Sequence, residues 1–215
     1  MKYHMGYLFL DIETYVSPDD DTSGLNPFRP ASKVLSIAYN YYDGFKVKES
    51  EIRKPTILKE WEDGEKKILT KLWDFLRVKL ENDEHLKFLG FNILKFDMTY
   101  LFGRMQVLKI ADKNEMYEVL YRRPHYIDLG QISQVITKNR FKEFLNVSQK
   151  TTNRFFDLPI KKGTGKDVSK FYDKKEYDKI LDYMNEEFCF ELLYQKLRRH
   201  VFAKKVNEIN EDSSN

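Results

Sequence analysis

The sequence predicts an α/β fold in which helices flank a mixed five-stranded sheet. Five short apolar runs are typical of strands, and segments with helical periodicity separate the later ones. The early strands are separated by a turn, which favours an antiparallel hairpin at the start of the chain. The later strands alternate with helices, which indicates parallel pairing and helices packed on the sheet.

The length of 215 residues fits one domain, which we place at 1–205, followed by a polar tail at 206–215 that we expect to be disordered. Apolar residues make up 41% of the chain, enough for a sizeable core although 33% of the residues are charged. The single cysteine, Cys189, excludes an internal disulfide. We find no signal peptide and no membrane span, so we expect a cytoplasmic, intracellular protein.

The amino-terminal part is expected to contain the hairpin. Its elements are a strand at 7–14, a loop at 17–33, a second strand at 34–39, a turn at 43–44 and a third strand at 45–48. The loop is rich in Pro, Gly, Asn and Asp, which favour turns. Its run Asp19–Asp21 is a weak candidate for a cation site, because three adjacent carboxylates cannot all face one ion. A solvated loop is the favoured interpretation.

The remainder of the chain alternates helices and strands. We expect a helix at 60–80, a strand at 86–92, a helix at 96–104, a strand at 126–129, a helix at 130–145, an irregular polar region at 148–166 and a long helix at 170–199. The helices follow from apolar residues at helical spacing. The first, fourth and fifth strands are expected to be parallel and central. Their carboxyl ends would then meet at the edge where such sheets bind ligands.

An acidic pair, Asp11 and Glu13, closes the first apolar run. In a strand, residues two apart lie on the same face. Two carboxylates held side by side repel one another, and burial raises the energy of that arrangement. A bound cation offsets it. The pair therefore predicts a metal site at the carboxyl end of the first strand.

Two further acidic positions follow. Asp97 opens a helix, where the helix dipole favours a carboxylate; it either faces the neighbouring strand end or is an ordinary helix-start acid. Tyr183 and Glu187 are spaced i, i+4 on the expected last helix, so they share one face about 5–6 Å apart at Cβ. They would place a carboxylate and a phenol beside the metal, or they form a surface pair.

With these residues in this order, the sequence resembles the DEDD superfamily of 3′–5′ exonucleases, which has the ribonuclease-H-like fold. Its first motif is matched fully by Asp11-Ile12-Glu13-Thr14. Its second motif, an Asn followed by an aromatic residue and Asp, is matched by Asn92 and Phe96-Asp97. The resemblance spans Tyr7 to Leu197 and suggests a free-standing exonuclease module.

The third motif is a variant. Tyr183, four residues before Glu187, is similar to the tyrosine branch of the superfamily, which includes the proofreading exonuclease domains of family B DNA polymerases. That branch carries Asp where this chain has Glu187. Because Glu is one methylene longer, a bound ion would shift unless the helix moves.

The resemblance implies phosphodiester hydrolysis with two divalent cations, Mg²⁺ or Mn²⁺, held by carboxylates. In this arrangement Asp11 bridges both ions. Glu13 and Glu187 hold the ion that carries the nucleophile, and Asp97 holds the second ion. Tyr183 orients the attacking water. These five residues are the expected catalytic set.

The resemblance also implies substrate contacts. Thr14, Asn92 and Phe96 would contact the 3′-terminal nucleotides; Phe96 either stacks on a base or packs beneath its helix. Lys166 ends a basic, glycine-containing segment, 161–166, that lacks the spacing of a phosphate loop. The segment either touches the nucleic-acid backbone or is a solvated connector.

The expected function is a metal-dependent 3′–5′ exonuclease that acts on the ends of single-stranded DNA, with replication or repair proteins as partners. Two alternatives stay open. The first is an exonuclease acting on RNA, because the fold serves both nucleic acids. The second is a catalytically weak, exonuclease-like module that binds nucleic acid or scaffolds a complex, an alternative that the variant Glu187 leaves open.

Overall fold

The structure is a computed structural model that describes residues 5–15, 17, 26–45, 48–83, 85–136, 147–160 and 163–212, without the side chains of Glu187 and of 202–212. The strands are β1 (Gly6–Tyr15), β2 (Lys33–Asp43), β3 (Thr56–Lys59), β4 (Lys87–Gly90) and β5 (His125–Asp128). The helices are α1 (Glu60–Asp63), α2 (Glu65–Asn82), α3 (Asp97–Val107), α4 (Lys113–Tyr117), α5 (Leu129–Ile136), α6 (Gln149–Phe155), α7 (Gly165–Asp173), α8 (Tyr177–Glu187) and α9 (Phe190–Asp212). Single turns of tighter and wider helix lie at Glu49–Glu51 and Glu118–Arg122.

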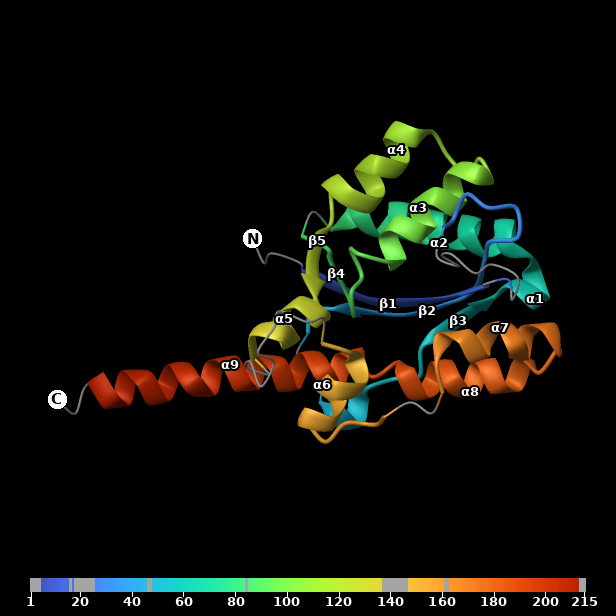
Figure 1. Ribbon diagram of the computed structural model, residues 1–215. Helices are drawn as coiled ribbons and strands as arrows, with labels where there is room; N and C mark the ends of the chain where they lie inside the picture. Colours follow the sequence, from blue (N-terminus) through green and yellow to red (C-terminus); the bar gives the residue numbers. More distant parts are fainter. Residues whose placement is uncertain are drawn as a thin grey trace.

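The five strands form one mixed sheet in the order β3-β2-β1-β4-β5. β1 pairs antiparallel with β2 and parallel with β4, while β4 pairs parallel with β5. Helices cover both faces of the sheet, as Figure 1 shows. This confirms the predicted α/β fold with a mixed five-stranded sheet flanked by helices. One detail of the prediction is wrong, since β5 lies at an edge of the sheet and not at its centre.

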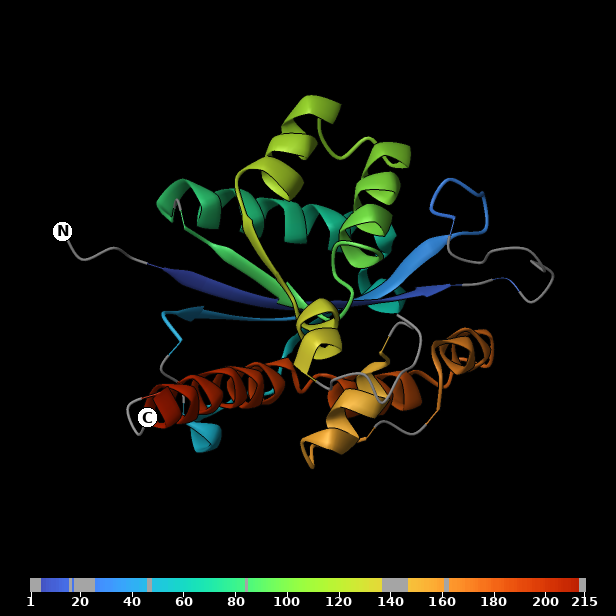
Figure 2. The ribbon, with the colours of Figure 1, turned by 60° about the vertical axis from the view of Figure 1, so that its left-hand side comes forward.

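Alternate residues of β1 enter two separate hydrophobic cores. Leu8, Leu10 and Ile12 pack with side chains of α2 and α3, while Tyr7 and Phe9 pack with side chains of α8 and α9. Figure 2 shows these two helix layers on opposite sides of the sheet. Because β1 is covered on both faces, its sequence reads as a continuous apolar run until the acidic pair.

The third strand lies at Thr56–Lys59 and not at the expected 45–48. Gly44 has a φ of 85°, and Phe45 turns its ring onto Phe9, with 5.1 Å between ring centroids. Phe45 is therefore a core residue outside the sheet; residues 46–47 lie outside the described part. β3 instead pairs antiparallel with the middle of β2. It is a short edge strand without a fully buried residue, so its apolar pattern is weak.

The carboxyl-terminal third differs from the expectation in two places. The expected irregular region contains α6, which Ser148 caps by accepting a hydrogen bond from the backbone N–H of Thr151 at 3.1 Å. The expected single helix at 170–199 is instead divided among α7, α8 and part of α9. The chain reverses direction at Lys175, which has a φ of 58°, and α8 ends before Phe188. The helix expected at 130–145 is α5, and residues 137–146 lie outside the described part.

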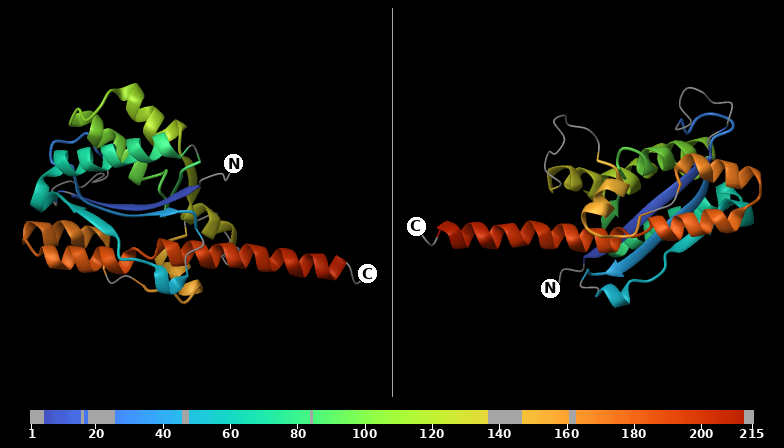
Figure 3. Two further views of the ribbon diagram at one scale, coloured as in Figure 1. Left: turned by 180° about the vertical axis from the view of Figure 1, so that it is seen from behind. Right: turned by 60° about the horizontal axis from the view of Figure 1, so that its bottom comes forward.

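The last helix, α9, runs to Asp212 and extends away from the sheet, as both views in Figure 3 show. Its backbone is thus helical past the expected domain end at 205, and the boundary itself stays a prediction. Among the described residues, no helix has the combination of length and apolar composition that crossing a bilayer requires.

A buried ion pair joins the two helices on one face of the sheet. Arg104 of α3 donates two hydrogen bonds to the Glu65 carboxylate of α2, at 2.8 and 2.7 Å. Glu65 also accepts from the backbone N–H of Val34 in β2 at 2.8 Å, and Arg104 donates to the carbonyl of Pro27 at 2.8 Å. These bonds fix α3, and with it the helix start at Asp97, against the sheet.

Candidate active site

A cavity of about 360 Å³ lies at the carboxyl end of β1, and we call it the carboxylate cavity. Its walls come from β1, the turn between β4 and α3, the first turns of α6 and α7, and the middle of α8. The expected site residues that line it are Asp11, Glu13, Asn92, Phe96, Asp97 and Tyr183. The fold thus brings together residues that are more than 170 positions apart in the chain.

The acidic pair lies on one face of β1, as expected. Asp11 is half-buried and Glu13 is 7% exposed, on the face that carries Tyr7 and Phe9 earlier in the strand. A side-chain Cβ added at Gly165 would lie 3.9 Å from Glu13 Oε2, so the start of α7 closes over this carboxylate.

Asp97 is tied directly to the strand that carries the pair. The backbone N–H of Ile12, between Asp11 and Glu13, donates a hydrogen bond to Asp97 Oδ1 at 3.1 Å. Asp97 is only 2% exposed and occupies the first turn of α3, where the helix dipole favours its charge. It is therefore a buried acid that contacts β1, and not an acid on a helix surface.

Asn92 and Phe96 occupy the turn that connects β4 to α3. Asn92 has a left-handed backbone with a φ of 59°. Phe96 is half-buried and lines the cavity, while its ring centroid lies 5.6 Å from that of Tyr100. Phe96 thus packs on α3, as one of the two interpretations expects, and it also lines the cavity, while its stacking on a base stays a prediction.

Tyr183 is buried in α8, with 4% of its surface exposed, and lines the cavity. Its ring belongs to the core that Phe9 enters from β1. This excludes a surface role for Tyr183. Glu187 is the last residue of α8, one turn further on; its side chain is outside the described part, so its predicted role as a metal ligand stays a prediction.

Two expected substrate contacts do not line the cavity. Thr14 is 6% exposed and follows a bulge in the pairing of β1 with β2, after Glu13. Lys166 is exposed on α7, next to the lining residue Gly165. Among the described residues, the cation that lines the cavity is Lys150, in the first turn of α6, which sequence reasoning missed. The cap residue Ser148 was the available signal for that helix.

The donor chemistry of the cavity suits a hard divalent cation. Asp11, Glu13 and Asp97 offer only carboxylate oxygens, the ligands that Mg²⁺ and Mn²⁺ prefer. In the described part of the chain, no three His, Cys, Asp or Glu side chains are close enough to hold an ion by themselves. An ion here would complete its coordination with water and substrate oxygens, as Mg²⁺ commonly does, or with Glu187.

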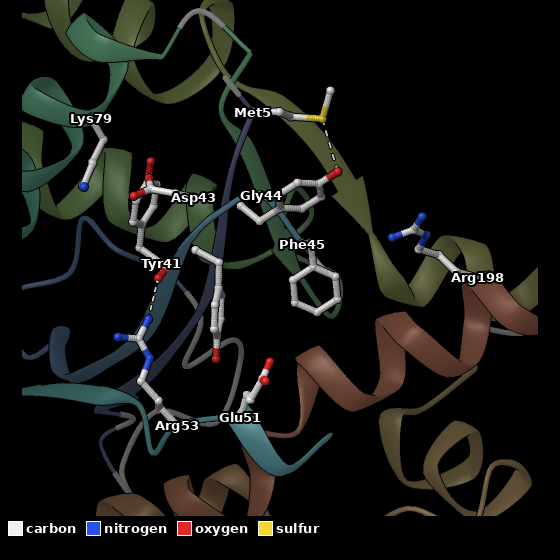
Figure 4. Close-up of a pocket in the computed structure, with 11 residues that line it drawn as sticks. Met5, Tyr41, Asp43, Gly44, Phe45, Glu51, Arg53, Lys79 and Arg198 are labelled. Atoms are coloured by element: carbon white, nitrogen blue, oxygen red, sulfur yellow. Dashed lines mark hydrogen bonds between the residues drawn. The ribbon is translucent and has the colours of Figure 1, made fainter. Parts of the chain in front are cut away.

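A second and larger cavity, of about 720 Å³, lies at the opposite end of β1, and we call it the aromatic pocket (Figure 4). Tyr7, Tyr41, Tyr42 and Phe45 line it, with Arg53, Lys79 and Arg198 among its charged residues. The cations face rings and backbone: Lys79 Nζ lies 3.7 Å from the Tyr41 ring centroid, and Arg53 donates to the Tyr41 carbonyl at 2.9 Å. Its two described acids, Asp43 and Glu51, come from separate elements and not from alternate positions of one strand as in β1, so we do not take this pocket as the active site.

Comparisons with known proteins place this fold. No family model and no curated protein sequence matches the chain. The structure of the family B DNA polymerase from the hyperthermophilic archaeon Pyrobaculum calidifontis is similar with a TM-score of 0.60 and 16% identity, over 92% of this chain and 24% of that one. A product-bound structure of exonuclease I is similar with a TM-score of 0.54 and 12% identity, over 91% of this chain and 43% of that one. The chain thus spans less than half of either protein, and it shares with both structures the ribonuclease-H-like fold.

Proposed function

We propose that this chain is a metal-dependent 3′–5′ exonuclease that removes nucleotides from the end of single-stranded DNA. The observation that carries the proposal is the carboxylate cavity, where Asp11 and Glu13 of β1, Asp97 of α3 and Tyr183 of α8 meet. The similarity in fold to exonuclease I supports a nuclease, and DNA is favoured because the other similar structure is of a DNA polymerase by name.

The reaction requires a water to attack phosphorus while negative charge grows on the leaving oxygen. Divalent cations held by Asp11, Glu13 and Asp97 would lower the pKa of a bound water and stabilise that charge. Tyr183 faces the same cavity with a hydroxyl that both donates and accepts, so it can hold the attacking water in line. Burial of Glu13 and Asp97 limits the freedom of these ligands, which lowers the reorganisation that the reaction needs.

The terminal nucleotide would be held by the turn before α3 and by the first turn of α6. The amide of Asn92 offers both a donor and an acceptor, and the ring of Phe96 offers a stacking surface worth about 1–3 kcal/mol per base. Lys150 would contact a substrate phosphate, because it is the cation that lines the cavity. The roles of Thr14 and Lys166 stay predictions.

Glu187 is proposed as a further metal ligand from its place one turn after Tyr183 at the end of α8. Its side chain is one methylene longer than Asp. A displacement of about 1 Å in a catalytic ligand can change a rate on the order of 100-fold. We therefore expect Glu187→Asp to change the rate measurably in either direction and Glu187→Ala to reduce it.

The decisive experiment is a degradation assay on a single-stranded DNA oligonucleotide labelled at either end. We expect a 5′ label to give a ladder and a 3′ label to be released as mononucleotide, with Mg²⁺ or Mn²⁺ and not with a chelator. Asp11→Ala should lower the rate at least about 100-fold, because metal ions supply several kcal/mol of transition-state stabilisation.

The matched control is Asp43→Ala, which removes an acid from the end of β2 in the aromatic pocket and should leave the rate unchanged. An RNA oligonucleotide of the same sequence, run in parallel, decides between the two nucleic acids. If the wild-type protein degrades neither DNA nor RNA with either metal, the proposed activity is wrong.

A further inference from the structure

A buried carboxylate outside the cavity is hydrogen-bonded to the turn that contains Asn92. Asp128, the last residue of β5, is 6% exposed and lies opposite Gly90 in the pairing of β4 with β5. Its Oδ1 accepts three backbone hydrogen bonds, from Asn92 at 3.0 Å, Gly130 at 2.9 Å and Gln131 at 3.3 Å. One oxygen thus joins the turn after β4 to the start of α5.

The conformation of Asn92 depends on this bond. Its φ of 59° lies in the left-handed region, which an L-residue adopts only when the surroundings impose it, although Asn tolerates it better than most. The N–H of Asn92 is held by Asp128, and its carbonyl accepts from the N–H of Phe96 at 3.0 Å. Both backbone polar groups of Asn92, its N–H and its carbonyl, are therefore hydrogen-bonded at the start of the turn that leads to Asp97.

The side chain of Asn92 is placed by the same group of residues. A Cβ added at Gly130 would lie 2.7 Å from Asn92 Oδ1 and 3.2 Å from Asp128 Oδ1. Any side chain at Gly130 would thus push the amide of Asn92 away from its position. Because Gly130 has no side chain, the amide of Asn92 rests against the α5 backbone while Asn92 lines the cavity.

We propose that Asp128 is a positioning residue for substrate binding, acting with Gly130 through Asn92. Asp128 does not line the carboxylate cavity, so it has no direct contact with the reacting groups. A carboxylate suits this place because hydrogen bonds to a charged acceptor are stronger than neutral ones, and three of them compensate its burial. The inference rests on the proposed function, in which Asn92 contacts the terminal nucleotide.

The test compares four variants by steady-state kinetics on the single-stranded DNA oligonucleotide: Asn92→Ala, Asp128→Asn, Gly130→Ala and the double variant Asn92→Ala/Gly130→Ala. Gly130→Ala is the sharpest, since it keeps the charge of Asp128 while the added Cβ lies closer to Asn92 Oδ1, at 2.7 Å, than to Asp128 Oδ1, at 3.2 Å. We expect it to raise KM about tenfold, as loss of one well-placed hydrogen bond does, with little change in kcat. Asp128→Asn keeps an acceptor and should raise KM less.

The double variant distinguishes positioning from general damage to the fold. If Gly130 acts through Asn92, Asn92→Ala/Gly130→Ala should have the KM of Asn92→Ala alone, because coupled residues are not additive. Thermal melts check that each variant is folded at the assay temperature. Additive increases in KM, or a loss of kcat at constant KM, would overturn the inference.

A binding measurement separates this inference from the proposed function. Fluorescence anisotropy with the labelled oligonucleotide and a chelator reports the dissociation constant without catalysis. If the wild-type protein binds but does not degrade, a tenfold weaker binding by Gly130→Ala still supports the positioning role. If the protein degrades DNA and all variants keep the wild-type KM, the inference alone is wrong; if it does not bind the oligonucleotide at all, both are.

Discussion

The two ends of β1 present the same face of one strand to two different cavities. At the start of the strand, Tyr7 and Phe9 enter an aromatic cluster, and Phe9 has no exposed surface. At its end, Asp11 and Glu13 face the carboxylate cavity. The alternation that buries the first pair of residues also directs the second pair into the cavity.

Size does not identify the functional end. The aromatic pocket, with about 720 Å³, has twice the volume of the carboxylate cavity, with about 360 Å³. What distinguishes the smaller cavity is the convergence of polar groups from separate elements, which is the better sign of a site. In the aromatic pocket, Lys79 faces a ring and Arg53 faces both a ring and a backbone carbonyl.

The two ends also have opposite effects on stability. The ring of Phe9 contacts those of Phe45 and Tyr194, with centroids 5.1 and 6.1 Å apart, and such pairs are worth about 0.5–1.5 kcal/mol each. Asp11 and Glu13 repel one another at the other end. The aromatic half of the strand thus stabilises the fold, whereas the two neighbouring carboxylates of the acidic half oppose one another.

The largest effect that this comparison predicts is on catalysis. Asp97→Asn should lower the rate of oligonucleotide degradation about 100-fold, because it removes a charge that would hold a metal ion. The fold should survive, since the Asn side chain can still accept from the N–H of Ile12. The matched variant is Tyr7→Phe, which removes only a hydroxyl bonded to Met5 Sδ at 3.2 Å. Degradation at the wild-type rate by Asp97→Asn, or an equally slow Tyr7→Phe, would contradict the contrast between the two ends.

A smaller effect is expected on substrate affinity. Lys150→Ala should raise KM about fivefold at low salt and less at high salt, because a lysine–phosphate contact is screened by ions. Lys150→Arg should restore most of the affinity. Lys79→Ala removes a cation of the aromatic pocket and should not change KM. A salt-dependent rise in KM for Lys79→Ala would mean that nucleic acid also binds at the aromatic pocket.

The smallest effect concerns stability against pH. Glu191 of α9 is fully buried, and its Oε1 accepts from Asn40 Nδ2 at 2.8 Å and from the Tyr42 hydroxyl at 3.3 Å. Its Oε2 has no hydrogen-bond partner in the described part of the protein. Burial raises the pKa of the Glu191 carboxyl above its ordinary value, and the bonds from Asn40 and Tyr42 offset this only in part.

The sign of the pH effect follows from this shift. A raised folded-state pKa means that the contribution of Glu191 to stability is complete below its unfolded pKa, near 4.3, and is lost as pH rises through the folded value. Glu191→Gln should lack that loss, so its melting temperature should fall less than that of the wild type between about pH 4 and 8, by a few degrees. If the melting temperatures of the two proteins instead fell by the same amount across this range, the Glu191 carboxyl would not contribute to the pH dependence of stability. Degradation activity should not change.

Much of the fold could be predicted because its central elements carry local signals. β1 begins with a continuous apolar run, β2 is rich in apolar residues, and α2 has buried residues at helical spacing. β3 was misplaced because only its pairing with β2 makes it a strand. The break between α7 and α8 was not predicted because the chain reverses at Lys175, a non-glycine residue in the left-handed conformation. No Gly or Pro in this segment indicates a turn.

The cavity residues divide in the same way. Asp11, Asn92 and Tyr183 belong to motifs with fixed spacing, so they could be named before the structure was known. Lys150 could not, because the chain around it was expected to be irregular. Asp128 could not be named either. It ends a four-residue strand, and the backbone N–H groups that it accepts from belong to Asn92, Gly130 and Gln131, a set that no sequence motif indicates.

The division of the cavity between distant parts of the chain has a consequence for synthesis. Asp11, Glu13 and Asp97 come from the first half of the sequence and Tyr183 from the last third. A nascent chain emerges amino-terminal end first at about 5–20 residues per second, so α8 follows α3 by on the order of ten seconds. During that interval one face of the sheet, with Phe9, is uncovered. The helix that brings Tyr183 to the carboxylate cavity thus also covers this part of the core. A chain that ends before α8 should therefore lack one wall of the cavity and should also be prone to aggregate.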